Sequence, residues 1–194
     1  MTHLDGVIFT HSHQDHTGGI DDLRVYSFRN QATLPCLGSK ETSDDIKRRF
    51  YFMFTEQKNE KGFERLKFEE FPETKGEYDF LGVKLSYFTY DQIGMPVNGL
   101  VFGNLAYVTD IHVYDDTIFE HLRGVETLIL SALRFTPSHM HFTVDQAVDF
   151  ARKTGAKKTY LTHTSHELDY YKTNSILPSD IRLAYDSLEI PFIG

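Results

Sequence analysis

The sequence predicts a mixed α/β (α+β) fold in which two sheets pack together with helices outside, a four-layer αββα arrangement. Some of its strands are joined by short turns as hairpins, and others alternate with segments of helical periodicity. Periodicity alone supports only the class, α/β or α+β. With 194 residues, of which 40% are hydrophobic and 25% charged, we expect a single domain over residues 1–194 with a substantial core.

The first predicted elements are two strands with a helix between them. Residues 4–10 are mostly apolar and predict a strand. A glycine pair then starts a turn, and residues 20–28 predict a helix with acidic residues in its first turn. Residues 33–37 also have the composition of a strand. Because proline has no N–H for pairing, Pro35 confines this strand to a sheet edge or argues against it.

The middle of the chain predicts one helix and two strands. Residues 41–54 predict a helix that Thr42 or Ser43 could cap. Residues 56–62 are polar, lack apolar periodicity and end in glycine, so we expect a surface loop there. The two strands, which alternate apolar and polar residues, are expected at residues 65–71 and 83–89.

The second half of the chain contains the clearest local signals. Gly103-Asn104 separates residues 100–102 from residues 105–109, which predicts a hairpin with a two-residue turn. Residues 143–154 predict a helix that begins with a capping box and ends at Gly155. The remaining elements are a helix at residues 114–123 and strands at residues 127–132, 158–162, 181–184 and 188–190.

Residues 11–16 read His-Ser-His-Gln-Asp-His and directly follow the first predicted strand. Imidazole and carboxylate groups together suit Zn, Mn or Fe. His11 and His13 are two residues apart, so they point the same way in an extended segment. Asp15 and His16 are adjacent and diverge unless the chain turns. Two pairs with different directions indicate two metal positions; the alternative is a solvated loop that happens to be rich in histidine.

The run from Thr10 to His16 resembles the T-H-x-H-x-D-H signature of the metallo-β-lactamase-fold hydrolases. The next eight residues, Thr17 to Arg24, are similar to the branch with the cyclic-phosphate phosphodiesterases of phosphonate breakdown and the tRNase Z-like enzymes. The resemblance runs from Leu4 to about Ile193 and implies the same αββα fold. Relatives carry several strands before this motif, so the first N-terminal strands are expected to be missing. A fragment, a shortened gene product or a homodimer that covers the exposed sheet edge would each account for this.

Two later residues follow predicted strands and could complete the site. Asp110 comes after residues 105–109, and the resemblance implies that it is a ligand bridging two metal ions. The alternative is that Asp110 caps a helix. His163 is the first histidine of Leu-Thr-His-Thr-Ser-His, and the resemblance implies that it is the last metal ligand. The alternative is a histidine at a strand end, bonded to a neighbouring carbonyl.

The resemblance also implies a proton donor that does not bind metal. His139 and His141 both lie just before a predicted helix, and the separation of His141 from His163 matches this role better. The alternative is that His141 starts the helix and bonds to its backbone. His166 is expected to be a surface group or to support a ligand, since the cysteines that hold a separate zinc in some relatives are absent.

The chain departs from the family pattern at Gln92. Counting back from Gly99, this residue occupies the slot where relatives carry a histidine ligand. A neutral amide is a poor ligand beside imidazole. One metal could therefore be held by fewer groups, by Asp91 or by water, whereas His3 is not expected to replace the missing ligand.

The leading hypothesis is a metal-dependent hydrolase that cleaves a small or cyclic phosphodiester through a metal-activated water. One or two Zn²⁺ or Mn²⁺ ions per chain are expected. The alternatives are tRNA 3′-processing, thioester or lactone hydrolysis on the same fold, and a non-catalytic metal-binding protein. The expected metal ligands are His11, His13, Asp15, His16, Asp110 and His163, with His141 and Asp15 as catalytic residues and Gln92 as a doubtful ligand.

The composition of the chain limits the classes of partner and the location that we expect. The net charge of −8 argues against a large nucleic-acid-binding face, and Lys47-Arg48-Arg49 is expected to be a solvated helix face rather than a basic strip. The single cysteine, Cys36, lies in an apolar run and is expected to be a buried structural thiol. No apolar run approaches 18 residues, so we expect no membrane span and a cytoplasmic location.

Overall fold

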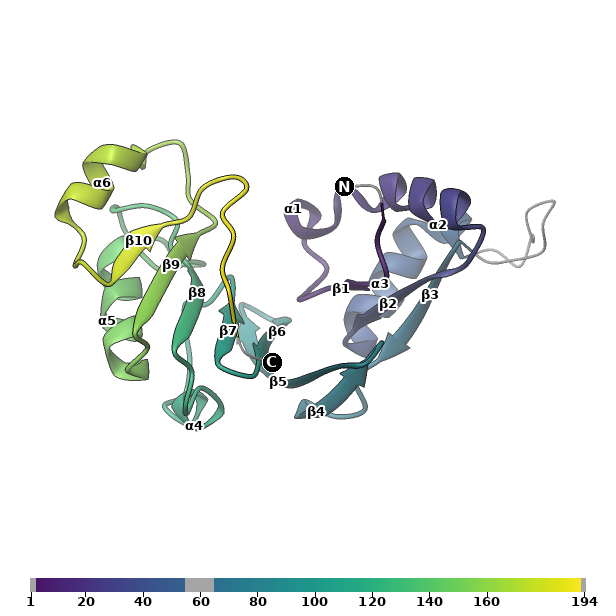
Figure 1. The fold of residues 1–194 in the computed structure, drawn as a ribbon, viewed down its shortest axis with the longest axis horizontal. Helices are drawn as coiled ribbons and strands as arrows, with labels where there is room; N and C mark the ends of the chain where they lie inside the picture. The colour runs from purple at the N-terminus through teal and green to yellow at the C-terminus, as the bar shows by residue number, and fades with distance from the viewer. Residues whose placement is uncertain (1–2, 55–64, 193–194) are drawn as a thin grey trace. The chain divides into compact units, whose positions relative to one another are not determined.

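Both predicted sheets are present in the computed structural model, which describes residues 3–54 and 65–192 (Figure 1). The chain divides into two compact units, which are described separately. Unit 1 comprises Met1–Thr74 and Phe80–Gly82, and unit 2 comprises Lys75–Asp79 and Val83–Gly194. The surface loop expected at residues 56–62 lies outside the described residues. The mixed α/β class is confirmed, whereas the expectation of a single domain stays a prediction.

Unit 1 contains a three-stranded parallel sheet with the strand order β1-β2-β3. Its strands are β1 (Val7–Ile8), β2 (Leu34–Gly38) and β3 (Leu66–Glu70). The helices are α1 (Gln14–Thr17), the 3₁₀-helix η1 (Ile20–Leu23), α2 (Arg24–Asn30), α3 (Lys40–Arg49) and the 3₁₀-helix η2 (Tyr51–Met53). Their apolar side chains form one core with the strands, in which Cys36, Ile46 and Leu66 are fully buried.

The prediction that Pro35 confines its strand to a sheet edge is wrong, because β2 is the central strand of unit 1. The N–H of Leu34 donates to the carbonyl of Arg65 on the β3 side, so the next backbone position faces β1. Pairing with β1 starts only at Cys36, which is the partner of Val7. The missing N–H of Pro35 therefore costs no hydrogen bond of the ladder.

The predicted cap of α3 is also wrong. The helix begins earlier than expected, and Ser39 is its N-cap, since the Ser39 hydroxyl accepts a hydrogen bond from the N–H of Thr42. The helix ends at Arg49, and the rest of the expected helix is the separate 3₁₀ turn η2. The sequence offered several consecutive candidates for the cap, and only the backbone conformation chooses among them.

Unit 2 is built on a seven-stranded sheet with the order β10-β9-β8-β7-β6-β5-β4. The strands β5, β6 and β7 pair antiparallel, whereas β7 to β10 pair parallel. The strands are β4 (Lys75–Phe80, whose last residue belongs to unit 1), β5 (Val83–Gln92), β6 (Met95–Phe102), β7 (Leu105–Val108), β8 (Thr127–Ser131), β9 (Lys158–Thr162) and β10 (Ile181–Leu183).

Three helices belong to unit 2: α4 (Ile118–His121), α5 (Val144–Thr154) and α6 (Tyr170–Ile176). The capping box predicted for α5 is confirmed, because the side chains of Thr143 and Gln146 each accept a hydrogen bond from the other's backbone N–H. The left-handed end at Gly155 is also confirmed. The apolar face of α5 packs on the sheet, with Phe150 fully buried.

Several predictions for unit 2 need correction. The helix expected at residues 114–123 begins only at Ile118, because a turn closed by the Asp115 carboxylate and the Thr117 N–H precedes it. Residues 188–190 form no strand; they follow a turn in which the N–H of Leu188 donates to the carbonyl of Tyr185. The strand β4 and the helix α6 were not predicted, because the polar composition of β4 and the short amphipathic α6 carry weak signals.

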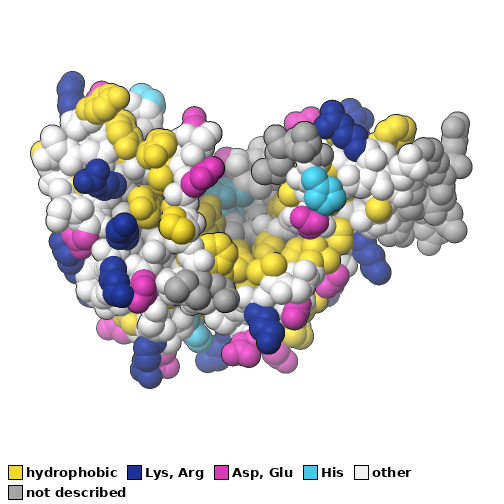
Figure 2. Space-filling model, viewed as in Figure 1, with side chains coloured by type: hydrophobic (Ala, Val, Ile, Leu, Met, Phe, Trp, Pro, Cys, Tyr) yellow, Lys and Arg dark blue, Asp and Glu magenta, His cyan; other side chains and the backbone are white. Residues whose placement is uncertain are grey.

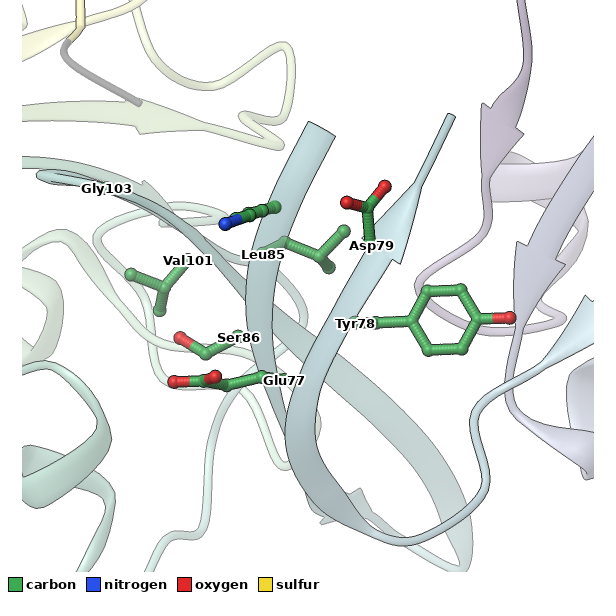
Figure 3. A pocket seen from close by; sticks show the side chains of 8 residues that line it. Glu77, Tyr78, Asp79, Leu85, Ser86, Val101 and Gly103 are labelled. Carbon is green, nitrogen blue, oxygen red and sulfur yellow. The ribbon is translucent and has the colours of Figure 1, made fainter. Parts of the chain in front are cut away.

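Charged and hydrophobic side chains both reach the surface of unit 2. On the face in Figure 2, Lys and Arg side chains are scattered among Asp and Glu, and hydrophobic side chains reach the surface over α6, where Tyr171 and Ile176 are exposed. A pocket of about 440 Å³ is lined by residues of β4, β5 and β6, including Glu77, Asp79 and Lys84 (Figure 3). None of the predicted site residues lines it. Among the described residues, no helix is long and apolar enough to cross a membrane.

Candidate metal centre

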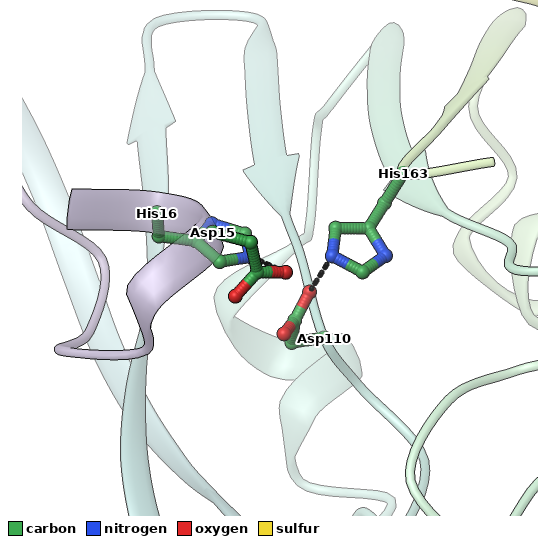
Figure 4. Close-up of side chains that lie close together, drawn as sticks. All are labelled: Asp15, His16, Asp110 and His163. Carbon is green, nitrogen blue, oxygen red and sulfur yellow. Dashed lines mark ion pairs between the residues drawn. The ribbon is translucent and has the colours of Figure 1, made fainter. Parts of the chain in front are cut away.

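In unit 1, the predicted metal ligands converge where the loop that leaves β1 runs into the short helix α1, which carries Asp15 and His16. The Nε2 atom of His11 lies 3.1 Å from the Nδ1 atom of His13, and the rings of His11 and His16 lie 4.2 Å apart. Asp15 and His16 form an ion pair of 3.5 Å (Figure 4). His11 is fully buried, whereas the Asp15 side chain is 62% exposed. The loop therefore gathers three imidazoles and brings a carboxylate to its open side.

The conformation of this loop is held by Arg49, at the end of α3. Its Nη2 atom donates to the carbonyl of Ser12 at 2.6 Å and to the Thr17 hydroxyl at 3.2 Å, and its Nη1 atom donates to the Gln14 amide oxygen at 3.0 Å. Asp45 pairs with the Nε atom of Arg49 at 2.7 Å and orients the guanidinium. Arg49 thus anchors the segment with the predicted metal ligands to α3, a helix that provides none of those ligands.

The expectation that Lys47-Arg48-Arg49 is only a solvated helix face is therefore wrong at one position. Arg48 fits it, since its side chain is 79% exposed and reaches only Asp45. Arg49 is 27% exposed and contacts three residues of the loop. The sequence holds a weak signal for this difference. Residues 46 and 49 are three apart and share a helix face, and Ile46 is buried.

In unit 2, Asp110 and His163 come from the ends of parallel strands that flank β8. Asp110 lies two residues after the end of β7, and His163 follows β9 directly. Their side chains meet, with Asp110 Oδ1 at 3.3 Å from His163 Nε2 (Figure 4). Both residues have a left-handed backbone, with φ of 54° and 57°, which is costly for side chains with a Cβ. Asp110 caps no helix, since α4 begins eight positions later at Ile118.

Further contacts hold Asp110 in place, where it is fully buried. The Thr109 hydroxyl donates to Asp110 Oδ1 at 3.0 Å. The Tyr90 hydroxyl donates to the carbonyl of Thr109. Burial, together with the negative charge of Asp110, raises the pKa of Tyr90 well above its usual value. Tyr90 therefore stays a hydrogen-bond donor and fixes the backbone that presents the carboxylate.

His141 lies beside this pair. Its ring stacks on His163 with 4.9 Å between the centroids, and its Nδ1 atom lies 4.0 Å from Asp110 Oδ1. Gln92 is 2% exposed and turns its amide toward His141, with Nε2 at 2.9 Å from the carbonyl of Met140 and 3.3 Å from His141 Nδ1. Gln92, which occupies the slot where relatives carry a histidine ligand, thus lies beside His141, the residue predicted to donate a proton.

The other candidates lie apart from these clusters. Asp91 is exposed and accepts a hydrogen bond from the N–H of Gly94, which closes the β5–β6 turn. His3 pairs with Asp5 at 2.9 Å and is exposed. His139 and His166 are also exposed. Asp91 and His3 are thus engaged elsewhere, and neither takes the place of the usual histidine ligand.

Arg134, whose backbone pairs with the segment that follows His141, was not predicted as a site residue. Arg134 follows β8, and its carbonyl accepts a hydrogen bond from Val144, just after the segment that carries His141. Its Nε atom is buried and has no hydrogen-bond partner among the described residues, while its Nη1 atom lies 3.5 Å from Glu167. A lone arginine after a strand gives no sequence signal for such a position.

The side chains that could bind metal are imidazoles and carboxylates, which suit a divalent ion. Unit 1 offers His11, His13, Asp15 and His16, and unit 2 offers Asp110 and His163. Imidazole nitrogens and carboxylate oxygens are the ligands that Zn²⁺ and Mn²⁺ accept. A fully buried carboxylate such as Asp110 is usually paired or bound to metal, because burying its charge alone is costly.

Comparisons with known proteins identify the family of the chain. The sequence profile described as the Beta-lactamase superfamily domain matches residues 1–164. The crystal structure of a new diphosphatase from the PhnP family superposes with a TM-score of 0.86 at 32% identity, covering 97% of this chain and 70% of that one. YhfI from Bacillus subtilis, a metallo-β-lactamase fold protein, superposes with a TM-score of 0.70 at 18% identity, over 93% of this chain and 74% of that one, and supports the fold alone.

Among curated proteins, the chain is 30% identical over 190 residues to a protein named octanoyltransferase from Porphyromonas gingivalis (strain ATCC BAA-308 / W83). The match covers 96% of this chain but only 37% of that protein. The expected metallo-β-lactamase fold is confirmed, and so is the resemblance to its branch with the phosphodiesterases of phosphonate breakdown. The chain belongs to the beta-lactamase superfamily of metal-dependent hydrolases, and within it to the PhnP family.

Proposed function

We propose that this protein is a metal-dependent phosphodiesterase that hydrolyses a small or cyclic phosphodiester. The observation that carries the proposal is His141, which stacks on His163 beside the buried carboxylate of Asp110. A histidine next to a ligand pair, but held by other residues, suits proton transfer to a leaving group. The similarity to a diphosphatase of the PhnP family supports phosphorus–oxygen bond cleavage.

The donors of both units would hold the metal ions, which we propose are one or two Zn²⁺ or Mn²⁺ per chain. They are His11, His13, Asp15, His16, Asp110 and His163. When bound, a divalent ion supplies a Lewis acid and lowers the pKa of coordinated water. His11 and His13 would bind through ring nitrogens, and Asp110 would bind through a carboxylate oxygen.

Two residues of the chain move protons in this proposal. Asp15 is a carboxylate on the open side of its loop, so it can accept a proton from water and release it to solvent. His141 gives a proton to the leaving oxygen, which would otherwise depart as a poorly stabilised alkoxide. The side chain of His141 is 14% exposed, so bulk water has little access to compete for the proton.

The guanidinium of Arg134 is an argument for a phosphate-containing substrate and against a carboxylic ester or thioester. Its guanidinium has a buried Nε donor with no hydrogen-bond partner among the described residues and a loose pair with Glu167. Arginine recognises phosphate oxygens through paired donors, whereas a neutral acyl group gains little from it. We therefore propose that Arg134 contacts a non-bridging phosphate oxygen.

The curated relative is named octanoyltransferase, but covalent acyl transfer through a cysteine finds no support in this chain. Its single cysteine, Cys36, is fully buried in the core of unit 1, and burial raises the pKa of the thiol to about 12. A thiol with that pKa is not a nucleophile near neutral pH.

A phosphoanhydride is the second candidate substrate, because the PhnP-family structure is titled a diphosphatase. The same donors and the same proton donor would serve either bond. We propose a small substrate rather than RNA, since the net charge is −8 and the cations on the face in Figure 2 are interspersed with acids. We also propose that the protein forms a homodimer and is located in the cytoplasm.

The test is a substrate panel assayed with protein loaded with Zn²⁺ or with Mn²⁺. It contains a cyclic phosphodiester, a linear phosphodiester, a diphosphate, a thioester and a lactone. We expect turnover of the phosphodiesters and a loss of about 10²-fold or more in kcat for His141→Ala. His139→Ala, an exposed neighbour two residues away, is the matched control and should keep wild-type activity.

Two results decide the proposal. Turnover of thioesters or lactones, with none of the phosphorus substrates, would overturn it. Arg134→Ala should raise KM about 10-fold for the phosphodiester while kcat changes less, as expected when substrate binding is lost. Full metal loading without any turnover would instead support a non-catalytic metal-binding protein.

A further inference from the structure

A second pocket of unit 2, of about 510 Å³, lies where β9 and β10 meet the start of α6 (Figure 1). Its volume is typical of small-molecule sites, which span roughly 300–1,000 Å³. Cations and tyrosines dominate its wall, namely Lys157, Lys158, Tyr160, Tyr170, Arg182 and Tyr185. None of the predicted metal ligands lines this pocket, so the proposed function does not account for it.

The strand pattern brings three of these side chains to one face of the sheet. Thr159 and Leu161 of β9 are buried. Because side chains alternate along a strand, Lys158 and Tyr160 point to the opposite face. Arg182 is the register partner of Tyr160, and the residues on both sides of it in β10 are buried, so it points the same way. Two cations and an aromatic ring therefore share one short patch of the sheet.

Two other charged residues of the pocket already have partners. The carboxylate of Asp180 accepts hydrogen bonds from both Nη atoms of Arg152, at 2.5 and 3.1 Å. The Nζ atom of Lys157 lies 2.5 Å from the carboxylate of Glu126. Each of these pairs is neutral, so neither determines the charge of a ligand.

Lys158 and Arg182 are different, because their side chains are exposed and form no ion pair or hydrogen bond with a described residue. They contribute two unpaired positive charges in a chain whose net charge is −8. By comparison, the pocket in Figure 3 combines Lys84 with the acids Glu77 and Asp79. The pocket at β9 and β10 is therefore the one whose charge favours an anion.

Tyrosine rings provide a flat surface beside these cations. Tyr170, the first residue of α6, and Tyr185, which follows β10, contact each other edge to face with 6.1 Å between the ring centroids. This contact orients one ring against the other. Tyr170 is 37% exposed and Tyr185 is 56% exposed, so ring surface is left open to a planar group.

We propose that this pocket binds a mononucleotide, with its phosphate on Lys158 and Arg182 and its base stacked on Tyr185. A guanidinium presents paired donors that match phosphate oxygens, and every base has a π face that stacks on an aromatic ring. A bare anion would use the cations alone and leave the open ring unused. The inference does not rest on the proposed function, since it requires neither a metal ion nor turnover.

The test is calorimetric titration of the full chain with AMP, with adenosine and inorganic phosphate as the two halves of the ligand. We expect AMP to bind at least about 10-fold more tightly than either half, because only AMP uses both the cations and the ring. The affinity for AMP should be the same before and after treatment with a chelator.

Variants locate the bound nucleotide. Arg182→Ala should weaken AMP binding about 10-fold or more, because it removes a charge-assisted contact to phosphate. Tyr185→Ala should weaken it about 10-fold, whereas Tyr185→Phe keeps the ring and should keep the affinity. Lys84→Ala removes an exposed lysine from the pocket in Figure 3 and is the matched control, with wild-type affinity expected.

Circular dichroism checks that each variant is folded. If Arg182→Ala is not, Lys158→Ala is measured instead, and the same loss of affinity is expected. The proposal is overturned if the wild type does not bind AMP, or if inorganic phosphate binds as tightly as AMP. It is also overturned if folded variants at Arg182 and Tyr185 keep the wild-type affinity.

One further variant separates this site from the candidate metal centre. Weaker AMP binding in Arg134→Ala, with none in Arg182→Ala, would place the nucleotide at the metal centre and overturn the inference. Because each readout is binding and not turnover, a protein that hydrolyses no phosphodiester would refute the proposed function and leave this test intact.

Discussion

The donors of unit 1 and unit 2 are assembled in different ways. Those of unit 1 lie within the six residues 11–16, which form a loop and the start of α1, and Arg49 of α3 holds this segment. Those of unit 2 come from the ends of β7 and β9, and each sits on a left-handed backbone. The ligands of unit 1 are close in sequence, so a motif can reveal them. Those of unit 2 are far apart in sequence and come together only when the sheet forms.

This difference predicts which changes are most damaging. The largest effect is expected for Asp110→Asn, because the variant loses the negative charge of a fully buried candidate ligand. We expect kcat/KM to fall by on the order of 10³-fold and metal content per chain to decrease. Elemental analysis and steady-state kinetics check it. Unchanged metal content would mean that unit 1 binds metal without unit 2.

The next largest effect is expected for Arg49→Ala. The loop loses its hydrogen bonds to Ser12 and Thr17, so its imidazoles are less well oriented before metal binds. We expect metal affinity to weaken about 10–100-fold, the usual effect of removing a partner that orients ligands. Competition with a coloured chelator measures this.

Arg48→Ala is the matched control for that prediction. It removes the same charge one residue away, from a side chain that contacts only Asp45. Its metal affinity should stay at the wild-type value. If both variants weaken binding equally, the effect comes from the charge of α3 and not from the grip of Arg49 on the loop.

A gain is expected for Gln92→His, which restores the imidazole that the family carries in this slot. The additional ligand should increase metal affinity about 10-fold or raise the bound metal by about one equivalent per chain. Titration with Zn²⁺, followed by isothermal calorimetry, measures both. No change in affinity or in bound metal would show that a histidine at position 92 does not reach the metal ion.

The smallest effect concerns Cys36, which reports on unit 1 alone. Its folded pKa of about 12 lies above the ordinary value of 9.0, so the neutral thiol stabilises the folded state at pH below about 9. This contribution is lost as pH rises from about 9 to 12, because the unfolded chain ionises first. We expect slow reaction with a thiol reagent at about pH 8, fast reaction after unfolding, and a falling free energy of unfolding above pH 9. Fast labelling of the native protein would contradict the buried position.

Much of the fold could be predicted from local patterns. The capping box of α5, its end at Gly155 and the Gly103 hairpin depend on residues within a few positions, and all three are confirmed. Pro35 was misplaced because its neighbours in space, β1 and β3, decide which backbone groups need partners. A propensity rule has no access to that register.

The same division applies to the site. The loop at residues 11–16 is visible as a motif, and the resemblance pointed to Asp110, His163 and His141. The structure places these three together within unit 2. Arg49, Tyr90 and Arg134 were missed, since each acts through a contact to a distant backbone or side chain. Their roles follow from packing and not from the identity of their sequence neighbours.

The left-handed backbone at Asp110 and His163 also bears on how this protein could change over generations. At each position glycine or asparagine would relieve conformational strain, which is commonly worth on the order of 1 kcal/mol. Random libraries screened only for heat resistance should therefore enrich such replacements and lose metal binding at the same time. Proteins that keep aspartate at position 110 and histidine at position 163 are expected to have a lower melting temperature but to retain the metal site.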